Sequence, residues 1–378
     1  MSTLLKHRTI SRQLTTEIIA GKYSKTGRLP SEAQLVKRFG VSRPTVGRAM
    51  RELREQDLIE RRAGSGTYIR KEKDRGHSEH LVFPQIGLMM PSLFHTEIFE
   101  PICGELASLC RSNDYGLWWG ANMSSTAETR MTAAEADDLC GQFIERGVMG
   151  VFFVSFEHQS DRETTNQRIT ERLKQAGIPV VLLDRDIGVF PNRSDFDVVG
   201  VDNVAGGYLL ADHLIKLGIR RMVYLKRPLT APTVDSRIIG AQKAMHDNGL
   251  PTPQPFVYSG DPADIAFVKS FAQNQKTEAI LCTNDHLAAE LLQTLTRIGI
   301  RVPKDLRLVG FDNVRFASLL STPLTTVEQP VRDIAITAFS ALRERMTNST
   351  LPPRTLILTP RLVVRESCGA YLNQNRNS

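Results

Sequence analysis

The sequence predicts an α/β protein with a small N-terminal helix–turn–helix and hairpin, followed by a larger region of parallel β-sheets. Two short amphipathic segments with helix-capping residues lie between positions 29 and 55, and a glycine-containing hairpin pattern follows them. From residue 85 onward, short apolar runs alternate with helix-length segments, which is typical of parallel sheets covered on both faces. A chain of 378 residues should form two or three folding units.

The first helix of the helix–turn–helix is expected to begin after Ser31, because Gln34 follows at the spacing of a capping box. Apolar residues recur from Leu35 to Phe39 at helical spacing, and Gly40 should end this helix. An earlier amphipathic helix is predicted over Leu4 to Ala20. Its inward residues should be Leu14, Ile18 and Ile19.

A second helix should begin at Ser42, with Pro44 in the first turn, where no backbone donor is missed. Its buried stripe is predicted to be Val46, Ala49, Met50 and Leu53. Other faces carry Arg43, Thr45, Arg48 and Arg51. A helix that follows a tight turn and exposes Arg and Thr at its N-terminal end is suited to the DNA major groove. One exposed Arg alone would more simply be a solvated side chain.

The wing is predicted from Leu58 to Arg62 and from Thr67 to Arg70, around Ala63, Gly64, Ser65 and Gly66. Two glycines allow positive φ angles and a close approach of the backbone to a phosphate or a minor groove. Residues 1–75 hold 18 Lys and Arg against 8 Asp and Glu, whereas the remainder holds 30 against 33. The basic charge therefore belongs to the N-terminal part, as phosphate binding requires.

These N-terminal motifs resemble the winged helix–turn–helix of the GntR family of bacterial transcription regulators. The matching pieces are Leu29-Pro30-Ser31-Glu32, Val41-Ser42-Arg43, Thr45-Val46 and Gly64-Ser65-Gly66-Thr67-Tyr68. The family often has Arg where this chain has Ala33 and Gly47, so operator contacts are expected to shift, with Arg48 as a candidate. The resemblance implies a DNA-binding set of Ser31, Glu32, Ser42, Arg43, Pro44, Thr45, Arg48, Arg62, Gly64, Ser65 and Gly66.

The larger region is expected to contain eight buried strands, each followed by a helix-length segment. The strands are predicted at Ile86 to Met90, Gly116 to Trp119, Gly150 to Val154, Pro179 to Leu183, Val198 to Val201, Met222 to Leu225, Ala279 to Cys282 and Leu308 to Phe311. Glycines that should end helices stand before four of them, at Gly147, Gly177, Gly218 and Gly299. Sheets of this kind bind ligands at the carboxyl ends of their strands.

The motifs of this region resemble the effector domain of the LacI/GalR family, which shares its fold with periplasmic sugar-binding proteins. Matching pieces include Ile178 to Arg185, Val201-Asp202-Asn203, His213 to Gly218, Asn284-Asp285, Val309 to Asn313 and Pro323 to Gln329. The resemblance implies two lobes with a small molecule between them and crossovers near Asp186–Val198, Phe311–Asn313 and Thr325–Gln329. The family's usual DNA-binding head and hinge helix are absent, and a GntR-type head replaces them, as in arabinose-responsive repressors.

The predicted organisation is a winged helix–turn–helix domain at 1–73, a linker at 74–84 and a LacI/GalR-type ligand-binding domain at 85–370. Lobe 1 is expected at about 85–186 and 311–326, and lobe 2 at about 187–310 and 327–370. The stretch from Lys71 to Glu79 carries charge and no apolar residue, which is typical of an exposed linker.

The resemblance implies that ligand is bound by Asp184, Arg237, Asn284, Asp312 and Gln329. Carboxylates and an Arg fork together can hydrogen-bond vicinal hydroxyls, which both donate and accept. Any one Asp at a strand end could instead cap a helix. Arg185 is included as well, with pointing away from the ligand as its alternative.

The loop at Glu97, Ile98 and Phe99 lies where the family contacts ligand, although the family commonly has aromatics at the first two positions. Glu97 could accept hydrogen bonds from sugar hydroxyls, or simply stabilise a helix N-terminus. Phe99 could equally be a core residue.

Enzyme functions find little support in the sequence. There is no GxGxxG after a strand, no P-loop, no nucleophile elbow and no metal-ligand spacing, so neither a cofactor nor a metal is expected. The five cysteines are expected to be reduced thiols in a cytoplasmic protein. The N-terminus lacks the apolar core of a signal peptide, and no apolar run is long enough to span a membrane.

The sequence therefore predicts a homodimeric, ligand-responsive repressor that binds an operator in double-stranded DNA and responds to a small sugar. Two alternatives remain open. One is a regulator that senses a nucleobase or another non-sugar metabolite, and the other, from a different class, is a sugar-binding or sugar-modifying protein.

Overall fold

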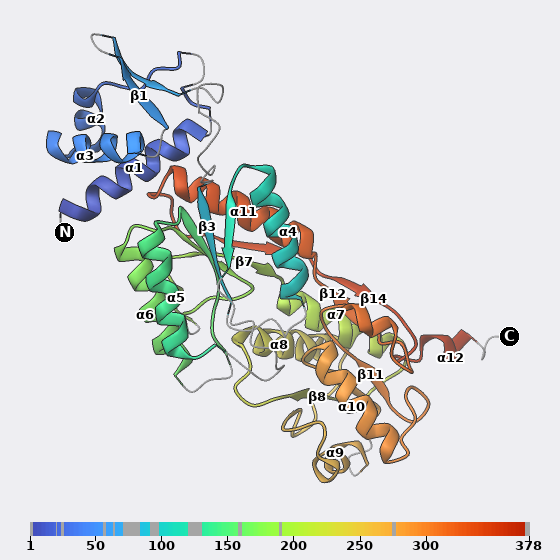
Figure 1. Ribbon diagram of the computed structural model, residues 1–378. Helices are drawn as coiled ribbons and strands as arrows, with labels where there is room; N and C mark the ends of the chain where they lie inside the picture. Colours follow the sequence, from blue (N-terminus) through green and yellow to red (C-terminus); the bar gives the residue numbers. More distant parts are fainter. Residues whose placement is uncertain are drawn as a thin grey trace.

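The computed structural model describes residues 3–19, 21–23, 26–55, 58–62, 65–70, 84–90, 98–119, 131–157, 161–188, 191–273 and 277–374. Within these ranges, the chain forms a small N-terminal head and two α/β lobes that follow one another along the molecule (Figure 1). None of the helices in these ranges has both the length and the apolar character that crossing a membrane requires.

The head contains three helices and a two-stranded wing, as the sequence predicted. Its elements are α1 (Thr3–Ile19), α2 (Glu32–Phe39), α3 (Arg43–Glu55), β1 (Ile59–Arg62) and β2 (Gly66–Ile69). Ser31 and Gln34 form the predicted capping box, and Gly40 ends α2 with φ of 62°. The predicted stripe of α3 is buried against Leu14 and Leu35, which gives the head its own hydrophobic core.

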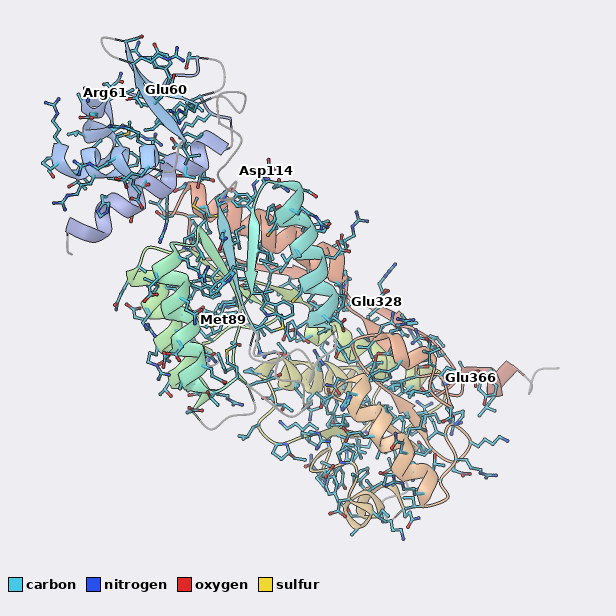
Figure 2. The ribbon with its side chains drawn as sticks, in the orientation of Figure 1. Glu60, Arg61, Met89, Asp114, Glu328 and Glu366 are labelled. Atoms are coloured by element: carbon cyan, nitrogen blue, oxygen red, sulfur yellow. The ribbon has the colours of Figure 1, made fainter. Side chains whose placement is uncertain are left out.

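Lobe 1 is built on a six-stranded parallel sheet with strand order β13-β7-β6-β5-β3-β4. Its strands are β3 (Gln85–Met89), β4 (Gly116–Trp119), β5 (Gly150–Val154), β6 (Val180–Leu183), β7 (Asp197–Val201) and β13 (Thr355–Leu358). One face is covered by α4 (Phe99–Ser112) and α11 (Val331–Thr347), and the other by α5 (Ala133–Arg146) and α6 (Arg162–Gln175). Met89, labelled in Figure 2, is fully buried in this lobe.

Lobe 2 is built on a four-stranded parallel sheet with strand order β11-β10-β8-β9. Its strands are β8 (Met222–Lys226), β9 (Val257–Ser259), β10 (Ala279–Cys282) and β11 (Arg307–Val309). The helices α7 (Asn203–Lys216) and α8 (Pro232–Asp247) pack on one face, and α9 (Ile265–Ala272) and α10 (Asp285–Arg297) on the other. The 3-10 helix η2 (Arg315–Ser318) and α12 (Ala370–Gln374) complete the lobe.

All eight predicted strands are present to within about two residues at their ends, and the four predicted glycines stand at helix ends with φ between 66° and 91°. The sequence did not indicate β9, β13, or the short antiparallel pair β12 (Thr326–Glu328) and β14 (Arg361–Val363). These strands are three or four residues long, so they carry little pattern of their own.

The predicted boundaries of the lobes are wrong for three segments. β7 pairs with β6 and β13, so the chain leaves lobe 1 only after Val201 and not within 186–198. It returns between Glu328 and Val331 and crosses again between Leu358 and Arg361, which leaves 311–326 in lobe 2 and α11 in lobe 1. Glu328, the last residue before the chain returns to lobe 1, is labelled in Figure 2. An apolar run in the sequence predicts that a strand is buried, but it does not say which strands lie beside it in a sheet. The assignment of strands to lobes therefore could not be read from the sequence.

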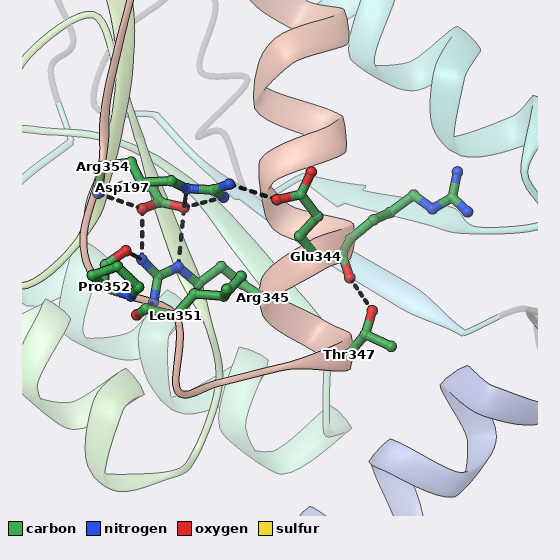
Figure 3. A network of polar contacts seen from close by, with 8 residues as sticks. Asp197, Glu344, Arg345, Thr347, Leu351, Pro352 and Arg354 are labelled. Atoms are coloured by element: carbon green, nitrogen blue, oxygen red, sulfur yellow. Dashed lines mark hydrogen bonds and ion pairs between the residues drawn. The ribbon is translucent and has the colours of Figure 1, made fainter.

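A buried ion-pair network fixes the edge of lobe 1 (Figure 3). Asp197, the first residue of β7, is fully buried and accepts hydrogen bonds from the guanidinium of Arg345 at 2.6 and 3.0 Å. Arg354 donates to the same carboxylate from Nη2 at 2.8 Å and from its backbone N at 2.8 Å. Because Arg345 lies on α11 and Arg354 precedes β13, one carboxylate joins three segments that are distant in sequence.

The head contacts lobe 1 through α1, which lies beside α11 in Figure 1. Arg12 donates from Nη1 to the main-chain oxygen of Ala176 at 3.3 Å, just after the end of α6. The central part of the predicted linker, residues 74–83, lies outside the described residues, together with 71–73.

Candidate functional site

The predicted recognition helix α3 presents a basic face. Arg43, Pro44 and Arg48 are exposed, as are Arg51 and Arg54 further along the helix. The buried residues of α3 hold the opposite face against the head's core, so the arginines point away from the protein. Arg43 lies 3.8 Å from Glu32 at the start of α2, which is too long for a hydrogen bond and leaves the guanidinium available.

Thr45 does not have the exposure that the sequence predicted. Its side chain is 2% exposed, and its hydroxyl lies 2.8 Å from the hydroxyl of Ser42. The prediction that Thr45 stands exposed beside the arginines is therefore wrong, because the residue shares the buried face with Val46. Ser31 is likewise engaged within the head, since its hydroxyl accepts from the backbone N of Gln34 at 3.3 Å.

The wing carries a second basic surface. The Arg62 guanidinium lies over the ring of Tyr68 at 4.8 Å and pairs with Glu60 at 2.6 Å. Ser65 and Tyr68 hydroxyls are 2.8 Å apart. Arg28 and Arg61, which the sequence analysis did not select, are also exposed; Figure 2 shows Arg61 and Glu60 on the wing.

Gly66 can be only glycine without rearrangement of the wing. Its φ is 122°, and a Cβ would lie 2.8 Å from Nε of Arg28. This backbone conformation is essentially restricted to glycine, in agreement with the predicted glycine-dependent turn. Gly64, the other glycine of the predicted DNA-binding set, lies outside the described residues.

Lobe 1 contributes a buried polar cluster at the carboxyl ends of its strands. Asp184 follows β6, and its Oδ2 accepts a hydrogen bond from Nη1 of Arg185 at 2.8 Å. Arg185 also donates to the Ser155 hydroxyl at 3.1 Å and carbonyl at 2.7 Å, and lies 3.5 Å from Glu157. Arg185 therefore points into the cluster and holds Asp184, whereas the alternative was that it points away. Ser155 and Glu157 were missed by the sequence analysis.

Lobe 2 contributes a matching cluster. Asp312 follows β11 and accepts a hydrogen bond from Nε2 of Gln329 at 2.7 Å. Arg237, on α8, donates from Nε to Asn203 at 2.8 Å and from Nη1 to the carbonyl of Thr283 at 2.7 Å. Its guanidinium lies 3.6 Å from the centre of the Phe311 ring, so this arginine is held on three sides.

Close helix packing brings Arg237 to its partners. A Cβ on Gly207 of α7 would lie 1.9 Å from the carbonyl oxygen of Arg237 on α8, so only glycine allows the two helices to approach this far. Asn203, at the start of α7, then reaches the Arg237 side chain. Asp202 caps α7 by accepting a hydrogen bond from the backbone N of Ala205.

The two clusters influence each other electrostatically. Burial raises the pKa of Asp312 to about 6, with Arg237 and Gln329 opposing the rise and Asp184 and Glu157 adding to it. Carboxylates of lobe 1 can raise the pKa of a lobe 2 carboxyl only if they lie near it. Asp184 and Asp312 also share a positive φ, 69° and 112°, which is uncommon for a residue other than glycine.

The remaining predicted ligand residues differ in their surroundings: one caps a helix, two are buried in a core and one lies outside the described residues. Asn284 uses its side-chain oxygen to cap α10, accepting from the backbone N of Leu287 at 2.9 Å, and its amide nitrogen remains for other contacts. Ile98 and Phe99 are buried in the core of lobe 1, so a direct ligand contact by Ile98 finds no support. Phe99 lies 5.9 Å from the Arg185 guanidinium. Glu97 lies outside the described residues.

A hydrogen bond between the lobes was not anticipated. Arg162, the first residue of α6 in lobe 1, donates from Nη1 to the main-chain oxygens of Leu229 at 3.0 Å and Thr230 at 3.4 Å. Both carbonyls follow β8 of lobe 2, and Leu229 has a φ of 56°. The two lobes are therefore tied together outside the polar clusters.

In the described ranges, no three His, Cys, Asp or Glu side chains are grouped so that they could hold a metal ion. All five cysteines are free and buried. Burial raises the pKa of the thiols of Cys103 and Cys110 to about 12, so these thiols are poor nucleophiles.

Two protein-family models match the chain. Bacterial regulatory proteins of the gntR family match residues 6–69, which is the head. A periplasmic binding protein-like domain matches residues 211–368, which includes most of lobe 2 and the returning segments of lobe 1.

Similar proteins of known function are transcriptional repressors rather than enzymes. The arabinose metabolism transcriptional repressor of Geobacillus stearothermophilus is 26% identical over 379 residues, covering 97% of this chain and 98% of that protein. The repressor PurR of Shigella sonnei is 32% identical over 195 residues, or 50% of this chain and 56% of that protein.

Solved structures show the same fold. A complex of the transcriptional regulator CelR with cellobiose has a TM-score of 0.64 at 23% identity and covers 86% of this chain and 91% of that one. A LacI family regulator from Enterococcus faecium with bound ribose has a TM-score of 0.60 at 22% identity and covers 75% and 98%.

A DNA-binding head joined to a two-lobed periplasmic-binding-protein-like domain defines a class of transcription regulators. This chain contains both parts: its head matches the model of gntR-family bacterial regulatory proteins, and its larger domain has the periplasmic-binding-protein-like fold that LacI-family regulators share.

Proposed function

We propose that this protein is a repressor of carbohydrate-utilisation genes whose operator binding is controlled by a small sugar held between the lobes. The observation that carries the proposal is the convergence of half-buried Asp184 and buried Asp312 from opposite lobes, each at a positive φ. Backbone strain of this kind is retained mainly at functional sites. The names of the relatives support a sugar, since they mention arabinose, cellobiose and ribose.

The mechanism would be thermodynamic linkage. An effector that contacts both lobes would stabilise their closed arrangement. Because the open and closed arrangements would bind the operator with different affinities, effector binding would change the free energy of operator binding by the same coupling free energy. As a DNA-binding regulator, the protein would act in the cytoplasm. Its ligand residues would be Asp184, Arg237, Asn284, Asp312 and Gln329, with Arg185 positioning Asp184.

A gel shift with the DNA upstream of the gene, with and without candidate sugars, tests the proposal. We expect one retarded complex whose affinity changes by at least about fivefold with a cognate sugar, because allosteric coupling is typically 1–3 kcal/mol. An unchanged complex with every sugar, together with a response to a nucleobase such as hypoxanthine, would reject the sugar and favour the alternative effector. A protein that retards no DNA would refute the regulator itself.

The protein should act as a homodimer on a palindromic operator, because two recognition helices must reach successive major grooves. Sedimentation of the full chain at micromolar concentration tests this assembly. A monomer under those conditions, still monomeric on operator DNA, would contradict it.

Arg43 is predicted to contact DNA at the N-terminal end of the recognition helix. Arg43→Ala should weaken operator binding by roughly 1–3 kcal/mol if its guanidinium reaches a base edge. Fluorescence anisotropy on operator and on scrambled DNA would separate lost specificity from lost charge. Arg54→Ala, at the far end of the same exposed face, is the matched control. Equal effects of the two substitutions would remove Arg43 from the recognition set.

Arg162 should favour the closed arrangement of the lobes. Arg162→Ala would remove its hydrogen bonds to Leu229 and Thr230, and we expect effector affinity to fall by about 1 kcal/mol, roughly fivefold, through faster dissociation. Stopped-flow release of the effector measures this rate. Arg168→Ala, on the same helix but paired within lobe 1 to Asp137, is the control. Dissociation that is equally fast in both variants would argue against an interlobe role.

A further inference from the structure

We infer that the head moves as one body with lobe 1, to which it is docked through one face of α1, and that this contact transmits movement of the lobes to the recognition helices. The inference rests on the proposed function, because it names the contact through which effector binding would reach the operator. Both sides of the contact belong to the same chain, so no further protein is needed to form it.

The helix α1 is buried on two opposite faces. Ile10 and Leu14 pack into the core of the head. Thr16 lies two residues beyond Leu14, which places it about 200° further around the helix, yet its side chain is only 5% exposed. An amphipathic helix of a small domain leaves the face opposite its core in water. Another part of the chain therefore covers Thr16.

Arg12 identifies that part as lobe 1. It lies one helical turn before Thr16 and on the same face of α1. Its Nη1 donates to the main-chain oxygen of Ala176 at 3.3 Å, at the C-terminal end of α6. A Cβ on Gly147, which ends α5, would lie 3.7 Å from its Nη2. One guanidinium therefore reaches the ends of two lobe 1 helices.

The chemistry of these helix ends favours a cation. The last carbonyls of an α-helix have no partner within the helix, and this end carries a partial negative charge. Arg12 meets two such ends at once, and this attraction needs no acidic side chain. The contact continues along α1 to Thr9, because a Cβ on Gly177 would lie 3.2 Å from the Thr9 hydroxyl. It thus follows one face of α1 from Thr9 to Thr16.

The helix α11 joins this contact to the neighbourhood of the polar clusters. It lies beside α1 (Figure 1), and its buried residues belong to the core of lobe 1. It begins two residues after Gln329, whose amide donates to Asp312 at 2.7 Å. Its 17 residues span about 25 Å at the rise of an α-helix. A single helix of lobe 1 therefore extends from the crossover between the lobes to the head.

Docking leaves the recognition surface open. Arg43 and Arg48 of α3 are exposed in the same structure in which α1 contacts lobe 1. The contact therefore orients the head and does not cover it. In a dimer, a change in the arrangement of the lobes would then move two docked heads relative to each other, and operator binding depends on the spacing of the two recognition helices. A head that was merely tethered would lose this dependence.

A distance measurement on the full chain tests the docking without effector or DNA. Spin labels are placed at Lys37→Cys on α2 and Gln167→Cys on α6, which are both exposed positions. The five native cysteines are buried, so the labels go to the introduced thiols. Labelled protein is diluted with unlabelled protein, so that each dimer carries one labelled chain. Electron–electron double resonance should give one narrow distance peak.

Thr16→Arg should release the head, because a long side chain cannot fit beneath the cover of Thr16. The distance peak should broaden, and the effector-induced change in operator affinity should fall from at least about fivefold to less than about twofold. The effector used is whichever of arabinose, ribose, cellobiose and hypoxanthine gives the largest response in the wild type. Its affinity should not change, because Thr16 belongs to the head.

Gln13→Arg is the matched control for Thr16→Arg. It adds the same side chain and charge at a half-exposed position of α1, and it should keep both the narrow peak and the effector response. Circular dichroism and binding to scrambled DNA, compared between the two variants, show whether the head still folds.

Arg12 provides a second, independent pair of variants. Arg12→Glu should release the head, because it places an anion at two helix C-termini, whereas Arg12→Lys should keep it docked, because it retains the cation. Equal release by both substitutions would show that the helix ends do not hold this residue, and would overturn the docking argument.

The remaining outcomes separate this inference from the proposed function. A broad distance distribution in the wild type would overturn the docking. A released head in Thr16→Arg with an undiminished effector response would overturn the coupling and leave effector control of the operator intact. A wild type that responds to none of the four compounds would reject effector control, and the coupling with it, whatever the distance shows.

Discussion

Replacing Arg237 by alanine is expected to weaken effector binding by roughly 2–5 kcal/mol. Truncating one member of a buried, hydrogen-bonded charged cluster costs this much, since the partners remain buried without it. Here the partners are Asn203, the Thr283 carbonyl and, electrostatically, Asp312. The loss should appear as a weaker affinity in calorimetry and as a missing effector response in the gel shift.

The control for this substitution is Arg221→Ala. Arg221 lies next to β8 in the same lobe, is half-exposed and pairs with Glu278 at 3.5 Å. Its substitution therefore removes an equal charge, but from the surface. Circular dichroism and thermal unfolding of both variants show whether the lobe still folds. If folded Arg237→Ala keeps its effector affinity, Arg237 does not belong to the binding site. DNA binding without effector should survive, because the head has its own core.

The head could be predicted from sequence almost completely because its signals are local. A capping box, a proline in a first helical turn and a glycine turn are each set by residues within a few positions of one another. Thr45 is the exception. The sequence pattern does not say whether Thr45, which precedes Val46, lies just inside or just outside the buried face of the helix. In the structure Thr45 is buried, and the hydroxyl of Ser42 is a hydrogen-bond partner for its hydroxyl.

The larger domain was predictable in its elements but not in its connections. Strand neighbours such as β7 and β13 are separated by more than 150 residues, and nothing in either strand's pattern identifies the other. The same limit applies to the site. Asp184 and Asp312 were found because they match family positions, whereas Ser155, Glu157 and Arg162 act through contacts between distant segments. Positive φ at an aspartate has no sequence signature comparable to glycine.

Asp197→Asn is expected to destabilise lobe 1 by about 3 kcal/mol. The substitution keeps the shape of the side chain but leaves Arg345, 10% exposed, without its counter-charge, and breaking a buried ion pair by removing one partner typically costs 3–5 kcal/mol. The lower end applies because Arg354 is 29% exposed and also pairs with Glu344. Urea unfolding of the full chain, with the lobe 1 transition followed by the fluorescence of Trp118 and Trp119, measures the loss.

The dependence on pH gives this prediction a second readout. Burial alone would raise the pKa of Asp197, but hydrogen bonds from Arg345 and Arg354 outweigh it and lower the pKa below its ordinary value. A carboxyl with a depressed folded pKa stabilises the protein above its unfolded pKa of about 3.9, and this contribution is lost as the pH falls through the folded value. The difference between wild type and Asp197→Asn should therefore be full at pH 7 and shrink below about pH 4. Asp195→Asn, two residues away and 72% exposed with Lys174 at 2.9 Å, should change stability by less than about 0.5 kcal/mol. Equal losses in the two variants would show that the network around Asp197 contributes no more than a surface pair.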